Sequence, residues 1–348
     1  MDPTPNKHVV QARRKRRDHA KMDGAGLAID RRELTAIEAT LEDVDFPPQV
    51  IVEVTNACNL RCEMCAHRIL TRPHAIMEES LFNKILEEIA TEAPHTRIWV
   101  SFYGEALLAK EKLWKFIRRA KAVGPLHLTL NSNGTMLDDE KIEHLVHEGL
   151  SRIVFSIDGL SKEIYERFRR GARHEEVYAA VPKVIEAARI NGDNPEIIVQ
   201  IIDMPGNRHE IPDFIKFWTD LGVVVKVKNL VTWTGAAVER SALDEWRIAC
   251  PWVITTFPIT VIGEALLCGA DYDANVPLGN VHQHSIKALW ARHRRYRRIH
   301  LEKCWDELPE LCTKCTDWQT VGSRVYYPDG RQAHLGIESK EPVAIGTA

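Results

Sequence analysis

Eight cysteines are the residues of this chain best suited to chemistry, and they fall into two groups along the sequence. The first group has the spacing Cys-x3-Cys-x2-Cys and consists of Cys58, Cys62 and Cys65. Iron-sulfur clusters usually take four cysteine ligands, so a triplet of thiolates leaves one iron open to another ligand. The alternative is a zinc knuckle with His67 as fourth ligand, because zinc also binds thiolates in a tetrahedral shell.

The second group lies near the C-terminus and contains Cys250, Cys268, Cys304, Cys312 and Cys315. Four of these five thiols would complete the ligand shell of a cluster. Only Cys312 and Cys315 form a tight Cys-x2-Cys pair, whereas a zinc ribbon normally has two such pairs. The spacing therefore favours iron-sulfur over zinc and indicates a second metal site.

The elements that must position the first group follow a regular alternation between residues 49 and 229. The β-rich segments predict strands at 50–54, 97–102, 126–131, 152–157, 196–202 and 223–228. Apolar residues at helical spacing predict helices at 79–92, 110–122, 138–148, 174–190 and 209–221. Strict alternation predicts an α/β fold with a parallel sheet, curled into an open (partial) (β/α)6 TIM-like barrel. Active sites lie at the C-terminal ends of such strands, where the cysteine triplet falls.

Four segments are expected along the chain. They are an N-terminal extension (1–48, partly disordered, with a basic run at 13–17), the barrel (49–232), a small C-terminal α+β domain (233–335) and a tail (336–348). The C-terminal domain should contain two hairpins and a basic helix from 285 to about 302, which we expect to face solvent.

The composition argues against some classes of function and some cellular locations. The 348 residues include 46 basic and 49 acidic side chains, so the net charge of −3 gives no general attraction to nucleic acid or membranes. No apolar run reaches the roughly 18 residues that cross a bilayer, and the N-terminus lacks a secretory pattern. We expect a cytoplasmic protein whose cysteines are metal ligands or reactive groups rather than disulfides.

The triplet resembles a known signature. The stretch 55–65, Thr-Asn-Ala-Cys-Asn-Leu-Arg-Cys-Glu-Met-Cys, follows an apolar strand and is similar to the signature loop of the radical S-adenosylmethionine (SAM) enzymes. The resemblance implies that Cys58, Cys62 and Cys65 hold a SAM-binding 4Fe-4S cluster. It also implies reductive cleavage of SAM to a 5'-deoxyadenosyl radical, which removes an unactivated hydrogen atom. Met64 departs from the family, in which many members carry an aromatic residue at this position.

Later strand ends resemble the places where this family contacts SAM. Gly104 and Glu105 are similar to the glycine-rich motif that holds the amino group, and glycine permits close approach. The segments 131–134 and 156–159 match places that contact the ribose and the carboxylate, and Arg169 or Arg170 would pair with the carboxylate. The resemblance implies a cofactor-binding set of Gly104, Glu105, Asn131, Asn133, Ser156, Asp158 and Arg169.

The second cysteine group resembles the shortened auxiliary-cluster domain of the SPASM/twitch radical SAM enzymes. That resemblance implies one auxiliary 4Fe-4S cluster, held by Cys250, Cys268, Cys312 and Cys315. Cys304 is then left over. It is a small buried hydrophobe, a replacement for one of the four ligands, or a catalytic thiol that returns a hydrogen atom to a carbon radical.

The resemblance implies an oxidoreductase of secondary metabolism that acts on a hydroxylated carbon of a sugar, aminocyclitol or related metabolite. An electron donor such as flavodoxin or ferredoxin would supply the reducing electron. Three alternatives stay open: a redox-neutral epimerase that uses Cys304, a maturase of a ribosomal peptide, and a zinc-stabilised binding protein without enzymatic activity. The general base is undecided among His67, His74, Glu105, Asp271 and Asp273.

Overall fold

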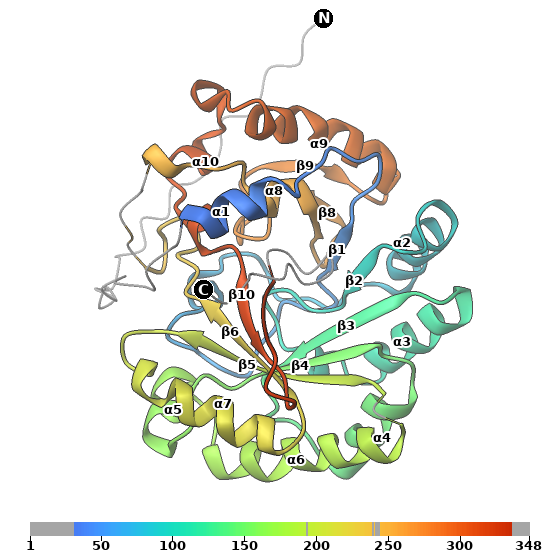
Figure 1. Ribbon diagram of the computed structural model, residues 1–348. Helices are drawn as coiled ribbons and strands as arrows, with labels where there is room; N and C mark the ends of the chain where they lie inside the picture. Colours follow the sequence, from blue (N-terminus) through green and yellow to red (C-terminus); the bar gives the residue numbers. More distant parts are fainter. Residues whose placement is uncertain (1–30, 193, 239, 241–243, 336–348) are drawn as a thin grey trace, which may run out of the picture.

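The computed structural model describes residues 31–192, 194–238, 240 and 244–335. The basic run at 13–17 and the expected tail at 336–348 lie outside the described residues. Figure 1 shows a curled sheet with helices around it, and the helices and strands between residues 251 and 313 gathered on one side of the molecule.

Six parallel strands form the centre of the sheet and follow one another in sequence order. They are β1 (Gln49–Val52), β2 (Arg97–Trp99), β3 (His127–Ser132), β4 (Arg152–Ser156), β5 (Glu196–Asp203) and β6 (Val224–Asn229). Their many valine and isoleucine residues favour extended backbone. The predicted α/β class and the partial barrel are confirmed.

Helices fill the crossovers between these strands and cover the outside of the sheet (Figure 1). They are α2 (Glu79–Glu92), α3 (Glu111–Val123), α4 (Asp139–His147), α5 (Lys162–Phe168), α6 (His174–Ile190) and α7 (Ile211–Asp220). Gly149, Gly192 and Gly222 follow α4, α6 and α7 with φ of 115°, 75° and 85°. Glycine favours this left-handed conformation, which ends helices.

The C-terminal part of the chain contains further short elements. They are α8 (Pro251–Thr255), β7 (Thr256–Ile259), β8 (Glu264–Leu266), β9 (Pro277–Asn280), α9 (Ile286–Leu301), α10 (Glu310–Thr313), β10 (Ser323–Tyr326) and β11 (Gln332–Leu335). Short 3-10 helices are η1 (Ala66–Ile69), η2 (Ala106–Ala109), η3 (Arg208–Glu210), η4 (Asp244–Trp246), η5 (Trp305–Glu307) and η6 (Asp317–Thr320).

The C-terminal strands extend the barrel sheet at both of its edges. Strand β7 pairs in parallel with β1, and β10 pairs antiparallel with β6. The result is one sheet of 11 strands in the order β11-β10-β6-β5-β4-β3-β2-β1-β7-β8-β9. The sequence predicts these hairpins but not their partners. Edge strands carry unpaired N–H and C=O groups, and the C-terminal hairpins satisfy those of β1 and β6.

The expected N-terminal extension contributes one described helix, α1 (Arg31–Glu38), which packs on the C-terminal elements. Its Leu34 and Ile37 belong to the same apolar cluster as Val253. A carboxylate oxygen of Glu38 accepts a hydrogen bond of 2.8 Å from the backbone N–H of Ala249. Residues 31–38 are therefore an integral part of the fold.

The expectation that the basic helix faces solvent is wrong for one side of α9. Trp290 and Arg297 are both fully buried, with 0% exposure. The Arg297 guanidinium lies 3.8 Å from the centre of the Trp290 ring and pairs with Asp43 at 2.6 Å. Burial of this arginine is tolerated because its charge has both an aromatic face and a carboxylate as partners.

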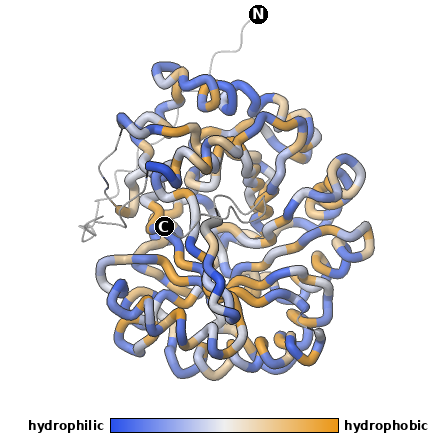
Figure 2. Tube along the Cα trace, viewed as in Figure 1, coloured by the Kyte–Doolittle hydropathy of each residue, from blue (hydrophilic) through white to orange (hydrophobic). Residues whose placement is uncertain are grey.

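Figure 2 shows hydrophobic residues concentrated along the barrel strands and more hydrophilic residues on the helices around them. Ile51, Trp99, Val154 and Ile198, which lie on β1, β2, β4 and β5, form an apolar cluster of their own. Within the part of the chain that the structure describes, no helix is both long enough and apolar enough to cross a membrane.

Candidate active site

The loop after β1 carries the cysteine triplet and is fixed by the last residue of α5 and the segment that follows it. The backbone N–H groups of Arg61 and Glu63 donate hydrogen bonds of 2.9 and 3.0 Å to carbonyls of residues 170 and 168. Two of the thiols accept backbone N–H groups: Cys58 Sγ from Leu60 at 3.5 Å and Cys65 Sγ from His67 at 3.4 Å. These donors are aimed at the sulfur atoms, as the thiolates of a cluster require.

Electrostatics of the triplet favour a cationic occupant. Burial raises the pKa of Cys58 to about 11 and that of Cys65 to about 12, and neighbouring thiolate charges add to the effect. A metal centre reverses this preference, because a coordinating thiol is deprotonated outright. Among the described residues, no three His, Cys, Asp or Glu side chains converge on a single metal ion. A four-iron cluster does not need such convergence, since each thiolate binds a different iron.

Gly104 lies against the backbone of the cysteine loop. A Cβ atom at this position would stand 2.2 Å from the carbonyl oxygen of Thr55 and 2.7 Å from that of Ala57. The next residue, Glu105, donates its N–H to the Ala57 carbonyl at 2.8 Å. Only glycine permits this approach, so Gly104 joins the end of β2 to the loop that carries the triplet.

Glu105 is 2% exposed, and both of its carboxylate oxygens are taken by protein groups. One accepts from the Ser132 hydroxyl at 2.9 Å, and the other from the Asn133 N–H at 2.7 Å. Burial raises the pKa of Glu105 although these bonds lower it. Glu105 therefore positions the end of β3, and its partners leave it badly placed for a general base.

Asn131 and Asn133 have different environments at the end of β3. The Asn133 amide nitrogen donates to Asn59 Oδ1 at 3.0 Å, and its Oδ1 accepts from Thr135, so this side chain ties β3 to the cysteine loop. Asn131 is half-buried, and no described residue donates to its Oδ1. Of the two predicted contacts, Asn131 has the open acceptor.

A buried ion pair connects the end of β4 to the triplet. Asp158 is fully buried, pairs with Arg169, and accepts the Ile202 N–H at 2.7 Å. The Arg169 guanidinium also donates to Cys62 Sγ at 3.8 Å. Burial acts to lower the pKa of Arg169, but the charges of Asp158 and Cys62 outweigh it and raise that pKa. Ser156, at the same strand end, accepts from Gln200 at 3.4 Å.

The other candidate bases have structural partners. His67 and His74 stack with ring centres 5.4 Å apart, and both contact the carbonyl of Asn56. Asp271 caps the turn at 275–276 with bonds of 2.7 and 2.8 Å, and Asp273 accepts from Thr71 at 2.8 Å. These contacts give each of the four side chains a structural role.

The second cysteine group lies around α8, β8 and α10. Burial raises the pKa of Cys268 well above its ordinary value, and the nearby thiolate charges of Cys312, Cys250 and Cys315 add to this. The four thiols are therefore within electrostatic reach of one another. Cys304 is half-buried and packs against the apolar cluster that contains Cys250, Cys268 and Cys312, and its thiol lies 3.8 Å from the Glu302 carbonyl.

The two cysteine groups are linked through a strained turn after β6. Trp233 and Thr234 both have left-handed φ, 56° and 58°. Asp317 holds this turn by accepting the backbone N–H groups of Thr232 and Thr234 at 2.6 and 2.9 Å. The Trp233 indole N–H in turn donates a hydrogen bond of 2.8 Å to the carbonyl of Met64. Residues beside the two predicted cluster sites thus contact one another through this turn.

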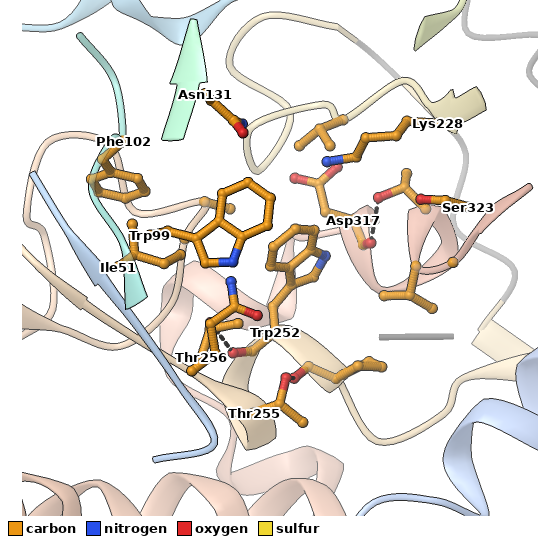
Figure 3. Close-up of a pocket in the computed structure, with 18 of the residues that line it drawn as sticks. Ile51, Trp99, Phe102, Asn131, Lys228, Trp252, Thr255, Thr256, Asp317 and Ser323 are labelled. Carbon is orange, nitrogen blue, oxygen red and sulfur yellow. Dashed lines mark hydrogen bonds between the residues drawn. The ribbon is translucent and has the colours of Figure 1, made fainter. Parts of the chain in front are cut away.

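A cavity of about 180 Å³ lies between the barrel and the C-terminal elements (Figure 3). Figure 3 shows Asn131, Lys228 and Asp317 pointing toward the space around the indole rings of Trp99 and Trp252. Lys226 also lines this cavity, and Cys304 is not among its lining residues. Sequence reasoning missed both lysines. The alternation Val-Lys-Val-Lys at 225–228, in a strand covered on both faces, is the signal that a polar group faces the barrel interior.

Comparison with known families agrees with this geometry. Residues 52–217 match the model of the radical SAM superfamily, and residues 250–316 match the SPASM iron-sulfur cluster-binding domain. The chain belongs to the radical SAM superfamily and carries a C-terminal SPASM domain. Its cofactors are the 4Fe-4S cluster with SAM and a SPASM auxiliary iron-sulfur cluster.

Similarity to particular proteins is distant. The chain is 28% identical over 205 residues to the 7,8-dihydro-6-hydroxymethylpterin dimethyltransferase of Methanocaldococcus jannaschii. The aligned region covers 58% of this chain and 39% of that protein. It spans about half the length or less of the first curated relatives that it matches.

Solved structures show the same fold. BtrN in complex with AdoMet and 2-DOIA superposes with a TM-score of 0.58 at 19% identity, covering 79% of this chain and 94% of that one. Streptococcus suis SuiB bound to precursor peptide SuiA superposes with a TM-score of 0.61 at 13% identity, and the superposition covers 83% of this chain and 74% of that one.

Proposed function

We propose that this chain is a radical SAM oxidoreductase that oxidises a hydroxylated carbon of a sugar, aminocyclitol or related metabolite. The observation that supports this proposal is the position of the cavity. The cavity is lined by Phe102, two residues before Gly104, and by Gly269, which follows Cys268. One cavity therefore lies next to both proposed cofactor sites, as a reaction that takes a hydrogen atom and then an electron from one substrate requires.

The proposed ligands follow from the two thiol groups. The SAM-binding cluster would be held by Cys58, Cys62 and Cys65, and the auxiliary cluster by Cys250, Cys268, Cys312 and Cys315. Asn131 and Ser156 would contact SAM or substrate directly, since both are half-buried at strand ends. Glu105, Asn133 and Asp158 would act as positioning residues, because their side-chain atoms are engaged by protein groups.

When bound, the clusters and SAM supply hydrogen-atom abstraction and a destination for the remaining electron, so that a secondary alcohol loses a hydrogen atom, an electron and a proton and becomes a ketone. The chain supplies binding and orientation. The Trp99 and Trp252 rings form apolar walls that exclude water from the reacting carbon. The free acceptor Asn131 Oδ1 would take a hydrogen bond from a substrate hydroxyl.

The test is anaerobic incubation of the reconstituted protein with SAM, a reductant and candidate sugars or aminocyclitols. Reduced flavodoxin or ferredoxin would serve as the electron donor. We expect 5'-deoxyadenosine and a ketone to form in equal amounts with the true substrate, and neither to form with a Cys65→Ala control. Formation of 5'-deoxyadenosine without any ketone would contradict the oxidation.

Heavy water separates the alternatives. Oxidation leaves no new carbon-bound deuterium in the product, whereas an epimerase with a thiol donor introduces it. The structure offers Cys304 little support as that donor, because Cys304 does not line the cavity. Dependence of 5'-deoxyadenosine formation on a precursor peptide would favour the maturase alternative. Stoichiometric zinc without SAM cleavage would favour the binding protein.

A further inference from the structure

Two buried N–H groups beside the second cysteine group have no acceptor among the described residues. The first belongs to His300, which is 2% exposed and whose Nδ1 accepts the backbone N–H of Cys250 at 3.3 Å. Because a ring nitrogen that accepts a hydrogen bond has no proton, the neutral ring carries its proton on Nε2. His300 therefore contacts the Cys250 backbone with one nitrogen and has an unused donor on the other.

The second such group is the Nε–H of Arg247. The Arg247 Nη2 donates a hydrogen bond of 2.7 Å to the carbonyl of Cys312, whereas its buried Nε has no described acceptor. Burial raises the pKa of the Cys250 and Cys312 thiols to about 11 and about 12, and the charge of Arg247 opposes that rise at both. Arg247 is therefore within electrostatic reach of two of the proposed cluster ligands.

The two donors have a common neighbour in Trp305. The Arg247 guanidinium lies 5.4 Å from the centre of the Trp305 ring, and the His300 ring lies 6.1 Å from it, centre to centre. The charge of Arg247 also acts on His300, whose pKa burial lowers to about 4. Both donors therefore lie near one another and near the same group of thiols.

The thiols themselves have other donors. Cys315 Sγ accepts the backbone N–H of Asp317 at 3.3 Å. Cys250 and Cys268 also accept backbone N–H groups. Buried donors are normally satisfied, so two unused ones beside these thiols are suited to acceptors that are present only when the cluster is bound. The sulfur atoms of an iron-sulfur cluster are such acceptors.

Hydrogen bonds to the sulfur atoms change the electron affinity of a cluster. Reduction adds negative charge, so N–H donors stabilise the reduced form more than the oxidised form. In the proposed oxidation, the substrate radical passes one electron to the auxiliary cluster and the hydroxyl proton leaves, so that a ketone forms and the cluster is reduced by one electron. A raised reduction potential favours this transfer.

We propose that His300 Nε2 and Arg247 Nε donate hydrogen bonds to sulfur atoms of the auxiliary cluster and raise its reduction potential. This inference rests on the proposed function, because the oxidation needs a cluster that takes up the electron of the substrate. Neither residue lines the cavity, so both act on the electron acceptor and not on the substrate.

The experiment is a redox titration of the anaerobic holoprotein followed by EPR, in which the auxiliary signal is the one that remains in Cys65→Ala. His300→Phe keeps a ring without an N–H donor, and Arg247→Met removes the guanidinium. We expect each change to weaken electron uptake by about tenfold, the effect of one charge-assisted hydrogen bond, which lowers the midpoint potential by about 59 mV. Midpoint potentials of both variants no lower than that of the wild type would overturn the proposal.

Matched controls and isotope labels separate the hydrogen bonds from effects on folding. His282→Phe and Arg298→Met should keep the wild-type potential, because His282 is exposed and the Arg298 side chain is 63% exposed and pairs with Glu302. In wild-type protein with isotopically labelled nitrogen in histidine or in arginine, pulsed EPR of the reduced auxiliary cluster should detect coupling to the label across each N–H···S bond. The histidine coupling should vanish in His300→Phe. Absence of coupling to both labels would overturn the proposal, and that measurement needs no variant to fold.

The two proposals fail separately. Ketone formation from candidate substrates is scored in the same preparations. Lowered potentials in His300→Phe and Arg247→Met, with nitrogen coupling in the wild type but no oxidation of any hydroxylated compound, would sink the proposed function and keep the two hydrogen bonds. Ketone formation by the wild type with unchanged potentials in both variants would have the opposite meaning.

Discussion

The Tyr103 hydroxyl donates a hydrogen bond of 2.6 Å to the backbone carbonyl of Gly269. Tyr103 precedes Gly104, and Gly269 follows Cys268, so this bond joins the edges of the two proposed cofactor sites. The Tyr103 ring also lies 5.3 Å, centre to centre, from the ring of Trp233. The relative position of the barrel and the SPASM domain is thus fixed beside the cavity.

Replacing Tyr103 with phenylalanine leaves the Gly269 carbonyl without its buried donor. We expect the free energy of unfolding to fall by about 1–2 kcal/mol. Urea denaturation of the anaerobic protein measures this. Tyr327→Phe is the control, because the half-buried Tyr327 ring contacts the Arg331 guanidinium through its face. An unchanged stability of Tyr103→Phe would show that the bond contributes nothing.

Gly104→Ala should displace the cysteine loop, since the new Cβ would stand 2.2 Å from the Thr55 carbonyl oxygen. We expect a loss of at least about 2 kcal/mol in unfolding free energy, as in overpacked cores, together with a lower iron content. Gly124→Ala is the control, because a Cβ there meets nothing within 4 Å. Its stability should change by less than about 1 kcal/mol. Full iron content in Gly104→Ala would contradict the close approach.

Arg169→Met breaks the buried pair with Asp158 and removes the donor to Cys62. Removing one partner of a buried pair costs about 3–5 kcal/mol, because the remaining charge is uncompensated. Arg170→Met is a neighbouring control: Arg170 pairs with Glu63 at 3.2 Å with a side-chain exposure of 60%, and its loss should cost less than about 1 kcal/mol. Similar denaturation midpoints for the two variants would refute the distinction.

Removing single cysteines tests the proposed ligand sets. Cys315→Ala should lower the iron content by about half, roughly four atoms per chain, because one of two clusters is lost. Cys304→Ala should keep the full iron content, since Cys304 is not among the thiols whose charges act on Cys268. Iron and sulfide determination on anaerobically purified protein gives the answer. Iron loss in the Cys304 variant would exchange the roles of these two cysteines.

The buried His293 makes stability depend on pH. Burial lowers the pKa of His293 from 6.5 to about 4, and its ring contacts the Leu267 carbonyl at 2.8 Å. The unfolded chain therefore binds a proton first, so stability present above pH 6.5 is lost as the pH falls toward 4. His293→Gln should remove about 1.4 kcal/mol per pH unit of this slope. Urea denaturation at several pH values between 4 and 6.5 measures this slope, and an unchanged slope in His293→Gln would contradict the role of His293.

The local elements were predictable because their signals are local. Helix α6 spans the predicted residues 174–190 and is followed by Gly192, and α2 spans the predicted residues 79–92, since apolar periodicity and helix-ending glycines act within a few turns. The cysteine spacing likewise predicts a cluster with an open iron without reference to the fold. The partners of the C-terminal hairpins were not predictable, because an edge strand can pair with any compatible neighbour.

The side chains at the strand ends also have some features that the sequence predicts and others that depend on distant parts of the chain. The sequence by itself determined which residue types follow each strand, including Gly104, Glu105, Asn131 and Asp158. Only the tertiary structure decided that the carboxylates of Glu105 and Asp158 bind other protein groups, whereas Asn131 Oδ1 has no described donor. It also decided that Lys226 and Lys228 line one cavity. The physical reason is that spacing fixes local geometry, whereas burial and pairing depend on segments far apart in the chain.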